Sequence, residues 1–165
     1  MAVRNVLSVL LANRDAAARI INPVINDGAR LKTKVAQVEV LNPSNIGSTF
    51  RLFSIPSNAR VHGLKLFCGA ITSAAADIGL YQTTVNGGAV AAVSCYATAQ
   101  SIATANVLGI EVAFEFRDII NAGRRAWQDA GASTDPFRDY DICLTLTAAS
   151  TAAGIVMLML EYAVD

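Results

Sequence analysis

The sequence predicts a mainly β domain, an antiparallel jelly-roll-like sandwich with one short helix and an N-terminal arm. Three observations predict it. Eight short segments rich in alternating apolar residues are separated by turn residues. One later segment has apolar residues at helical spacing, and the first part of the chain differs from the rest in charge and punctuation. A chain of 165 residues is expected to form one such domain.

The arm is expected at residues 1–33 and the β-sandwich domain at residues 34–165. Breaks at 13–15, 22–23 and 26–28 interrupt the arm, whereas strand patterns dominate from Lys34 onward. Residues 1–34 carry six basic and two acidic side chains, a net charge of +4, so the remainder of this neutral chain carries −4. Opposite charges on the arm and the body favour attraction between copies of the chain. A +4 arm without interleaved aromatic residues is only a weak indication of nucleic-acid binding, so a nucleic-acid partner is not expected.

The expected strands follow one another with short turns between them. They are residues 35–41, 49–55, 60–68, 76–83, 89–97, 111–116, 140–147 and 155–164. Asn86-Gly87-Gly88 is a tight-turn signal because these residues tolerate a positive φ. The small-residue segment 101–109 is expected to be a loop. This number of strands suits a sandwich or jelly roll.

One helix is expected between the strands, at about residues 116–130. Ile119, Ile120 and Trp127 share a helical face, Asp118 lies near its start, and Gly131 follows its end. A helix of about fourteen residues would cover one end of the sandwich, with Trp127 as its anchor.

Several strands are apolar on both faces. Phe53, Ile55, Val61 and Phe67 occupy positions that alternation assigns to the outer face, and residues 155–160 are apolar throughout. Only 16% of the residues are charged, against about 25% in average domains. We therefore expect another subunit to cover an outer face, in a homo-oligomer for which a dimer is favoured over a trimer.

The arm adds a second apolar element. Five of its aliphatic residues follow helical spacing within nine positions, and they are too apolar to remain in water. We expect the arm to pack against a different subunit or a larger assembly, and not against its own sandwich. The candidate interface residues are Val3, Val6, Leu7, Leu10, Leu11, Arg14, Phe53, Ile55 and Phe67.

The sequence indicates no catalytic, cofactor or metal site, so we do not expect an enzyme. The only histidine, His62, is in strand register with Leu64 and is expected to be a half-buried structural residue. Asp135 and Asp139 could bind calcium in a loop, but their spacing matches no known calcium motif, and an ordinary polar loop is favoured.

The three cysteines, Cys68, Cys95 and Cys143, fall in or beside strands without metal-binding spacing. They are expected to behave as small buried hydrophobic residues in a protein made in a reducing cytoplasm. A charge-free stretch at residues 142–160 is as long as a membrane helix. Its threonine alternation and central small residues favour two strands instead, so no membrane partner is expected.

Several segments together resemble small virion proteins of tailed bacteriophages, the capsid decoration or cement family. They are residues 13–15, 48–61 (STFRLFSIPSNARV), 77–81 (DIGLY), 86–90 (NGGAV) and 135–141. The resemblance implies a jelly-roll-like domain that binds the outside of an assembled shell of major capsid protein and clamps its neighbours together. It also implies a place on the outer capsid surface of the virion, and in the host cytoplasm during assembly.

A second hypothesis is a phage tail or fibre-associated module that recognises carbohydrate or a host surface. Exposed aromatic side chains would favour it, because sugars stack on aromatic faces. Aromatic residues make up only 7% of the chain, and most of them fit the core pattern. Binding to empty shells or to glycans would discriminate the two hypotheses.

Overall fold

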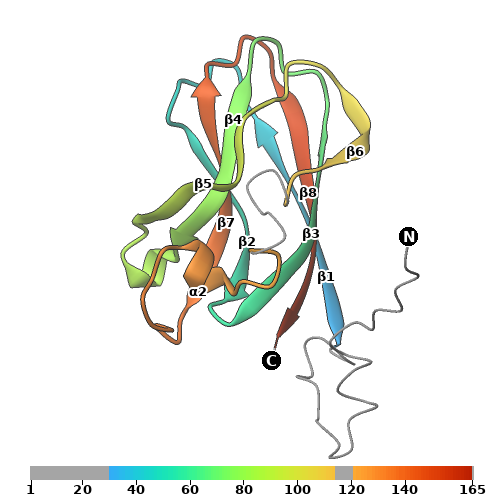
Figure 1. The fold of residues 1–165 in the computed structure, drawn as a ribbon. Helices are drawn as coiled ribbons and strands as arrows, with labels where there is room; N and C mark the ends of the chain where they lie inside the picture. The colour runs from blue at the N-terminus through green and yellow to red at the C-terminus, as the bar shows by residue number, and fades with distance from the viewer. Residues whose placement is uncertain (1–29, 114–120, 165) are drawn as a thin grey trace, which may run out of the picture.

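The computed structural model describes residues 30–113 and 121–164, which form two antiparallel four-stranded sheets packed face to face (Figure 1). The first sheet has the order β1-β8-β3-β6 and the second the order β2-β7-β4-β5. The strands are β1 (Leu31–Val40), β2 (Thr49–Pro56), β3 (Ala59–Cys68), β4 (Ala75–Gln82), β5 (Val90–Ser101), β6 (Asn106–Glu111), β7 (Asp139–Ala148) and β8 (Gly154–Val164). This strand order is that of a jelly roll, so the predicted fold class is confirmed.

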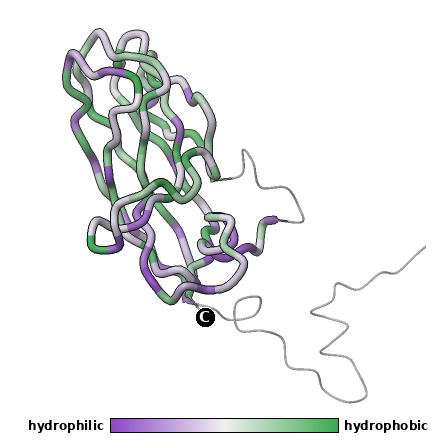
Figure 2. The backbone as a smooth tube through the Cα atoms, turned by 90° about the vertical axis from the view of Figure 1, so that its left-hand side faces the viewer, coloured by the Kyte–Doolittle hydropathy of each residue, from purple (hydrophilic) through white to green (hydrophobic). Residues whose placement is uncertain are grey.

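The core lies between the two sheets. Alternate residues of the central strands point into it and are fully buried, among them Leu66, Ile78, Ile142 and Leu158. Figure 2 shows apolar segments along the length of the body, while hydrophilic segments gather toward its lower end. That end carries the 3₁₀ turn η1 (Thr84–Asn86) and the single described helix, α2 (Ala126–Asp129).

Two β-bulges explain why β2 and β3 look apolar on both faces. The pairing of β2 with β7 shifts between Arg51 and Phe53, and that of β3 with β8 shifts between Val61 and Gly63. One extra residue moves every following side chain to the other face. Ile55 and Val61 are consequently fully buried, and their predicted place on an outer face is wrong.

The same bulges also explain why two other residues lie elsewhere than the sequence predicts. Phe53 is half-buried and packs against the core, so it does not belong to an outer apolar face. His62 is the extra residue of the β3 bulge and is exposed, whereas Leu64 and Leu66 point inward. The prediction of a half-buried histidine in register with them is therefore wrong.

The segment before residue 114 differs from the prediction. The expected loop at 101–109 is wrong, because β5 continues to Ser101 and β6 occupies Asn106–Glu111. The expected strand at 111–116 overlaps β6 only at Glu111, and residues 114–116 lie outside the described residues. Strand β6 is an edge strand with little burial, so it has no apolar alternation that could reveal it.

The expected helix of residues 116–130 is shortened. Among the described residues, helix occurs only at α2, and residues 116–120 lie outside them. Arg125 has extended backbone angles and bridges to Arg60 of β3, so the helix begins only after it. The Gln128 side chain accepts a hydrogen bond from the Arg125 amide at 2.9 Å. Trp127 packs against the core, as expected of an anchor.

Strand β1 begins at Leu31, which pairs with Ala163, rather than at Val35. The three residues 31–33, assigned to the arm, therefore belong to the sheet. Arm residues 1–29 lie outside the described residues. No helix among the described residues is long and apolar enough to span a membrane.

Candidate interaction surfaces

The outer face of the β1-β8-β3-β6 sheet is apolar and uncovered by described residues; we call it the open face. Its side chains alternate with the buried positions of the same strands, so Met157 and Met159 of β8 point outward between Val156, Leu158 and Leu160. Gln37, Met157 and Phe67 form one row across β1, β8 and β3. Val35 and Met159 form part of the next row.

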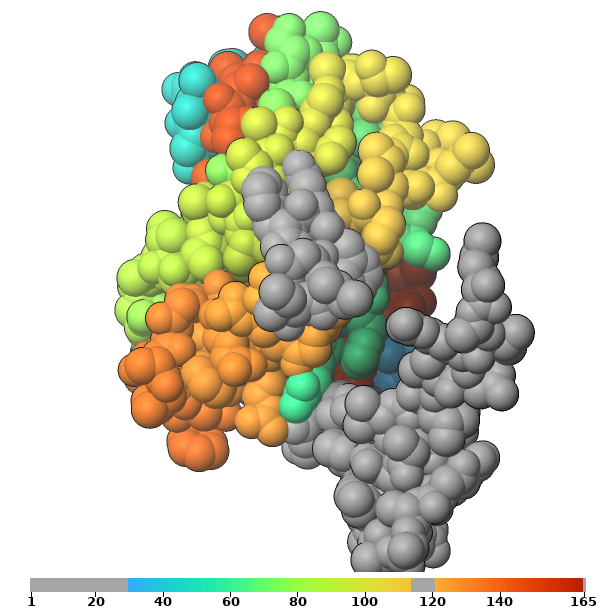
Figure 3. All heavy atoms as spheres, viewed as in Figure 1, coloured from blue at the N-terminus to red at the C-terminus, as the bar shows by residue number. Residues whose placement is uncertain are grey.

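A groove of about 300 Å³ lies on the open face between β1, β8, β3 and β6; we call it the sheet groove. Its lining includes Gln37, Phe67, Val107, Ile155 and Met157. Ile155 keeps 53% of its surface exposed and Val107 keeps 79%. In Figure 3 the part of the chain that contains β6 projects from the upper part of the body. The groove offers apolar and thioether groups, which suit an aliphatic partner.

Gly109 allows β6 to lie against the Phe67 ring. Its φ is +82°, and a Cβ atom there would come within 2.6 Å of Phe67 Cε1. The ring is held half-buried in one wall of the sheet groove. Glu39 and Glu161 lie on either side of the two rows of the open face, and Lys65, paired with Met159, lies within the second row, so charged side chains both border and interrupt the apolar patch.

Glu111, at the end of β6, has a structural role. Its Oε1 accepts hydrogen bonds from the backbone amides of Leu64, at 2.8 Å, and Ala113, at 3.0 Å. The carboxylate therefore ties the end of β6 to the backbone of β3.

The outer face of the β2-β7-β4-β5 sheet is covered by the chain itself; we call it the closed face. Arg51 of β2 reaches across two strands. Its Nη1 donates to Asp141 Oδ2 at 2.7 Å and to the Gln82 carbonyl at 2.8 Å, and its Nη2 donates to the Gly88 carbonyl at 2.9 Å. The guanidinium carbon lies 5.5 Å from the centre of the Tyr81 ring, a cation–π contact. One side chain therefore joins β2, β7, β4 and the turn before β5.

Strand β5 closes the rest of this face. Between the pairs Ile78–Ala97 and Leu80–Ala92, one β4 residue, Gly79, faces four residues of β5, 93–96. A Cβ atom on Gly79 would lie 2.1 Å from the Ala92 carbonyl oxygen, so the β5 backbone crosses directly over it. Only glycine allows this close approach.

Cys143 lies under this cover, in register with Arg51 and Gly79, and has no exposed surface. Burial raises the pKa of its thiol to about 12; nearby Arg51 lowers that pKa and Asp141 raises it. Burial also raises the pKa of Cys68, while Cys95 is half-buried. The prediction that the cysteines behave as buried apolar residues therefore describes Cys68 and Cys143 best.

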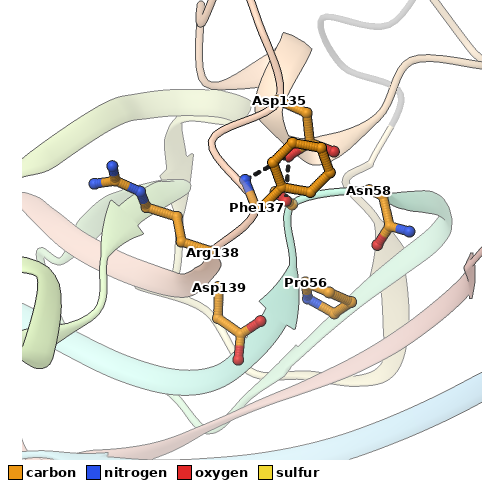
Figure 4. Close-up of a pocket in the computed structure, with 7 residues that line it drawn as sticks. Pro56, Asn58, Asp135, Phe137, Arg138 and Asp139 are labelled. Carbon is orange, nitrogen blue, oxygen red and sulfur yellow. Dashed lines mark hydrogen bonds between the residues drawn. The ribbon is translucent and has the colours of Figure 1, made fainter.

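A third surface lies at the lower end, around Phe137 (Figure 4). Phe137 is 90% exposed and has a φ of +50°, a left-handed conformation that is rare for a bulky residue. Asp135 holds this turn, because its Oδ1 accepts hydrogen bonds from the Phe137 amide at 2.9 Å and from Ser57 Oγ at 2.5 Å. The ring is presented to solvent by a rigid loop.

Two hollows flank Phe137. One of about 240 Å³ is lined by Pro56, Asn58, Asp135 and Asp139, and one of about 520 Å³ is lined by Val85, Asn86 and Arg138. Val85 is 94% exposed. Sequence reasoning missed Phe137, although an aromatic residue directly after Asp135-Pro136, in a turn rather than in a strand, was a usable signal.

The two candidate residues for calcium, Asp135 and Asp139, lie near each other, whereas the third aspartate of this segment, Asp141, lies apart from them. Asp141 is on the closed face with Arg51, while Asp135 and Asp139 line the hollow beside Phe137. Oxygen Oδ1 of Asp135 already accepts two hydrogen bonds. Within residues 30–113 and 121–164, no group of three or more His, Cys, Asp or Glu side chains could hold a metal ion.

Among the candidate interface residues, Phe67 alone is placed on the open face. Ile55 is in the core and Phe53 packs against it. The six arm candidates, Val3, Val6, Leu7, Leu10, Leu11 and Arg14, lie outside the described residues.

The fold is similar to solved structures of bacteriophage capsids. A chain of the cyanophage Pam1 capsid asymmetric unit matches with a TM-score of 0.59 and 12% sequence identity, over 90% of this chain and 95% of that chain. A chain of the Ralstonia phage GP4 capsid matches with a TM-score of 0.48 and 13% identity, over 90% and 93% of the two chains. A chain of the acidic stable capsid of Helicobacter pylori bacteriophage KHP30 gives 0.41 and 12%, over 82% and 92%.

At these identities the likeness concerns the fold. The first match shows that the same two-sheet architecture, at nearly the same length, occurs in a chain of a phage capsid. The sequence matches no protein-family model and no curated protein sequence.

Proposed function

We propose that the chain is a structural virion protein of a bacteriophage, a capsid decoration protein that binds the outside of the shell of major capsid protein and stabilises it. The observation that carries this proposal is the open face. A sandwich with a complete core still leaves Ile155 and Val107 exposed on one sheet, beside the half-buried Phe67 and Met157. The likeness to a chain of the Pam1 capsid supports a place in a virion.

The function needs contacts rather than catalysis. We assign contacts between copies to the open face, and contact with the shell to the lower end around Phe137 and Val85. Exposed aromatic residues held in a fixed conformation are typical anchors of protein interfaces. Phe137 meets both conditions, because it is almost fully exposed and Asp135 fixes its backbone.

Stabilisation of the shell follows from linkage. A protein that binds the assembled shell and not its dissociated subunits shifts the equilibrium toward assembly by mass action. Copies that also contact one another bind with avidity, so each single contact can remain weak. Because the closed face is covered by contacts within the chain, we assign the contacts with other copies and with the shell to the other surfaces.

The test is binding to shells assembled without this protein. We expect the purified chain to sediment with such shells and to raise their melting temperature. Phe137→Ala should weaken this binding at least about tenfold, the range of an interface anchor, while leaving the folded chain intact. The matched control is Val90→Ala, an exposed apolar residue outside the two hollows. Absence of binding by the unmodified chain would refute the proposal.

One observation favours the second candidate, a tail or fibre-associated binding module. The exposed Phe137 ring lies beside a hollow with the polar side chains of Asn58, Asp135 and Asp139, a combination that suits a sugar ring. Glycan binding that Phe137→Ala abolishes, together with no binding to shells, would establish this function instead.

A further inference from the structure

We propose that residues 3–11 of a second copy of this chain occupy the sheet groove. This inference rests on the proposed function in one respect, that copies contact one another on the virion. It identifies the pair of surfaces that would join them: the arm of one copy and the open face of the next. The lower end of the molecule, assigned to the shell, takes no part in it.

The chemistry of the two partners matches. Within nine residues the arm carries Val3, Val6, Leu7, Leu10 and Leu11, spaced i, i+3, i+4, i+7 and i+8. In a helix this spacing makes one apolar stripe, and an amphipathic stripe laid into an apolar groove is a recurring recognition mode. The sheet groove offers Phe67, Ile155, Met157 and Val107 to such a stripe.

Charge complements the apolar contact. Arg4 lies within the stripe and Arg14 follows it, in a segment, residues 1–29, with three basic and two acidic side chains, a net charge of +1. On the open face, Glu39 of β1 is paired in register with Ile155, beside the sheet groove. The face also carries Glu161 and one opposing charge, Lys65. Arginines within and after the stripe suit these two carboxylates.

The point where the arm joins the body favours a neighbouring copy as its source. The arm leads into β1 at Leu31, paired with Ala163, while the sheet groove lies near Gln37, paired with Met157. Six strand residues separate these points, roughly 20 Å along the strand. Figure 1 shows β1 starting at the lower end of the body and β6 lying toward the upper end. To fill its own groove the arm would have to reverse direction and run back along the sheet.

The length of the arm is sufficient for exchange. Residues 12–29 connect the stripe to Arg30, and these eighteen residues span at most roughly 60 Å when extended. That reach exceeds the roughly 20 Å between Leu31 and the sheet groove of the same chain, and it is long enough for the arm to extend to the open face of an adjacent copy. Turn residues such as Asn22-Pro23 and Asn26-Asp27-Gly28 give this connection places to bend.

The decisive experiment is cross-linking between two full-length variants in a Cys95→Ser background. One carries Leu10→Cys and the other Val107→Cys, so a disulfide joining positions 10 and 107 can form only between copies. We expect it in the mixture and identify it by mass spectrometry of the linked peptides. Val107 is 79% exposed, which makes the substitution compatible with folding. Replacing Val107→Cys by Val85→Cys, also an exposed valine but in the hollow beside Phe137, should remove the cross-link.

Association supplies a second readout. Val107→Asp, and separately Leu10→Asp with Leu11→Asp, should each raise the dissociation constant for self-association at least about tenfold. Combining them should add little, because both remove the same contact. Val85→Asp is the control and should leave the constant unchanged.

A third variant carries both Leu10→Cys and Val107→Cys in one chain. Three outcomes would overturn the inference: no disulfide between positions 10 and 107 in the mixture, full additivity of the arm and groove substitutions, and a disulfide that forms in the third variant only within single chains. None of them would affect binding to shells, which is measured separately with Phe137→Ala. Failure of arm exchange is therefore distinguishable from failure of the proposed function.

Discussion

On the closed face, the polar groups of the chain are used within the chain. Arg51 bonds to Asp141 and to two carbonyl groups, the Tyr81 hydroxyl lies 2.8 Å from Thr145 Oγ1, and the backbone of β5 crosses over Gly79. On the open face, the corresponding rows present methionines, a phenylalanine and an exposed isoleucine. Two sheets of one sandwich therefore differ in what covers their outer sides.

This difference indicates where a partner can be accommodated. An apolar patch that stays in water costs free energy, at roughly 25 cal/mol per Å² of apolar surface, and its burial by a partner recovers that free energy. The closed face already has its cover, so partner contacts are expected on the open face and at the exposed lower end. The predictions below test each half of the comparison.

The largest effect is expected from Gly79→Ala on the closed face. The new methyl group would overlap the Ala92 carbonyl, and backbone atoms cannot move aside as a flexible side chain can. We expect a loss of about 3 kcal/mol in the free energy of unfolding, measured by urea denaturation. The control is Gly69→Ala, where the nearest atom would lie 3.8 Å away, and the change should stay within about 0.5 kcal/mol. Equal effects of the two substitutions would mean that β5 does not cover Gly79.

Arg51→Met should have the next largest effect. It keeps a long apolar stem over Tyr81 but removes the ion pair with Asp141 and the bonds to the Gln82 and Gly88 carbonyls. We expect a loss of about 2 kcal/mol, reduced from the value for a buried pair because these side chains are partly exposed. The Arg51→Lys variant should recover only part of it, since one ammonium group cannot reach three acceptors. If the urea midpoint of the Arg51→Met variant is unchanged, the contacts of Arg51 are not needed to keep the closed face covered.

The two faces also differ in how far the sequence could predict them. Most strands could be located, because Asn42-Pro43, the turn at 56–59 and Asn86-Gly87-Gly88 separate them by local turn chemistry. The bulges at Arg51/Phe53 and Val61/Gly63 could not, because a bulge is defined by pairing with β7 or β8, about 90 to 100 residues further along the chain. Ile55 and Val61 were consequently assigned to the wrong face.

The candidate surfaces were predictable to a similar extent. The apolar outer positions of β8 followed from its continuous apolar run at residues 155–160, and that of Phe67 followed from its alternation with Leu66 and Cys68. The position of β6 beside Phe67 did not, because an exposed edge strand has no apolar period. Phe137 has no periodicity at all, and its exposure depends on the hydrogen bonds that Asp135 makes with Ser57 and the loop.

On the open face, Ile155→Thr should change the stability of the folded chain by about 0.5 kcal/mol or less. Its side chain is 53% exposed, so little buried surface is lost. Ile142→Thr, at a fully buried position, should cost several times more, because it also buries a hydroxyl group. The same Ile155→Thr substitution should weaken self-association, measured by sedimentation equilibrium. A large loss of stability without loss of association would mean that Ile155 belongs to the core rather than to an interface.

Near neutral pH the smallest effect on stability is expected from the thiol of Cys143, which reports on the cover of the closed face. At pH 8 we expect a maleimide reagent to modify native Cys143 far more slowly than the half-buried Cys95, because Cys143 is fully buried and its raised pKa of about 12 keeps the thiol protonated. In the unfolded chain the thiol pKa is near 9.0, so the unfolded state loses its proton first as the pH rises. The stabilising contribution is therefore complete below pH 9 and is lost between pH 9 and 12, with a slope of at most roughly 1.4 kcal/mol per pH unit. Cys143→Ala should remove this part of the alkaline dependence of the urea midpoint while leaving the rest. If Cys143 instead reacts as fast as Cys95, the part of β5 that covers it must open readily. The two faces would then differ in their average structure but not in how accessible their side chains are to solvent.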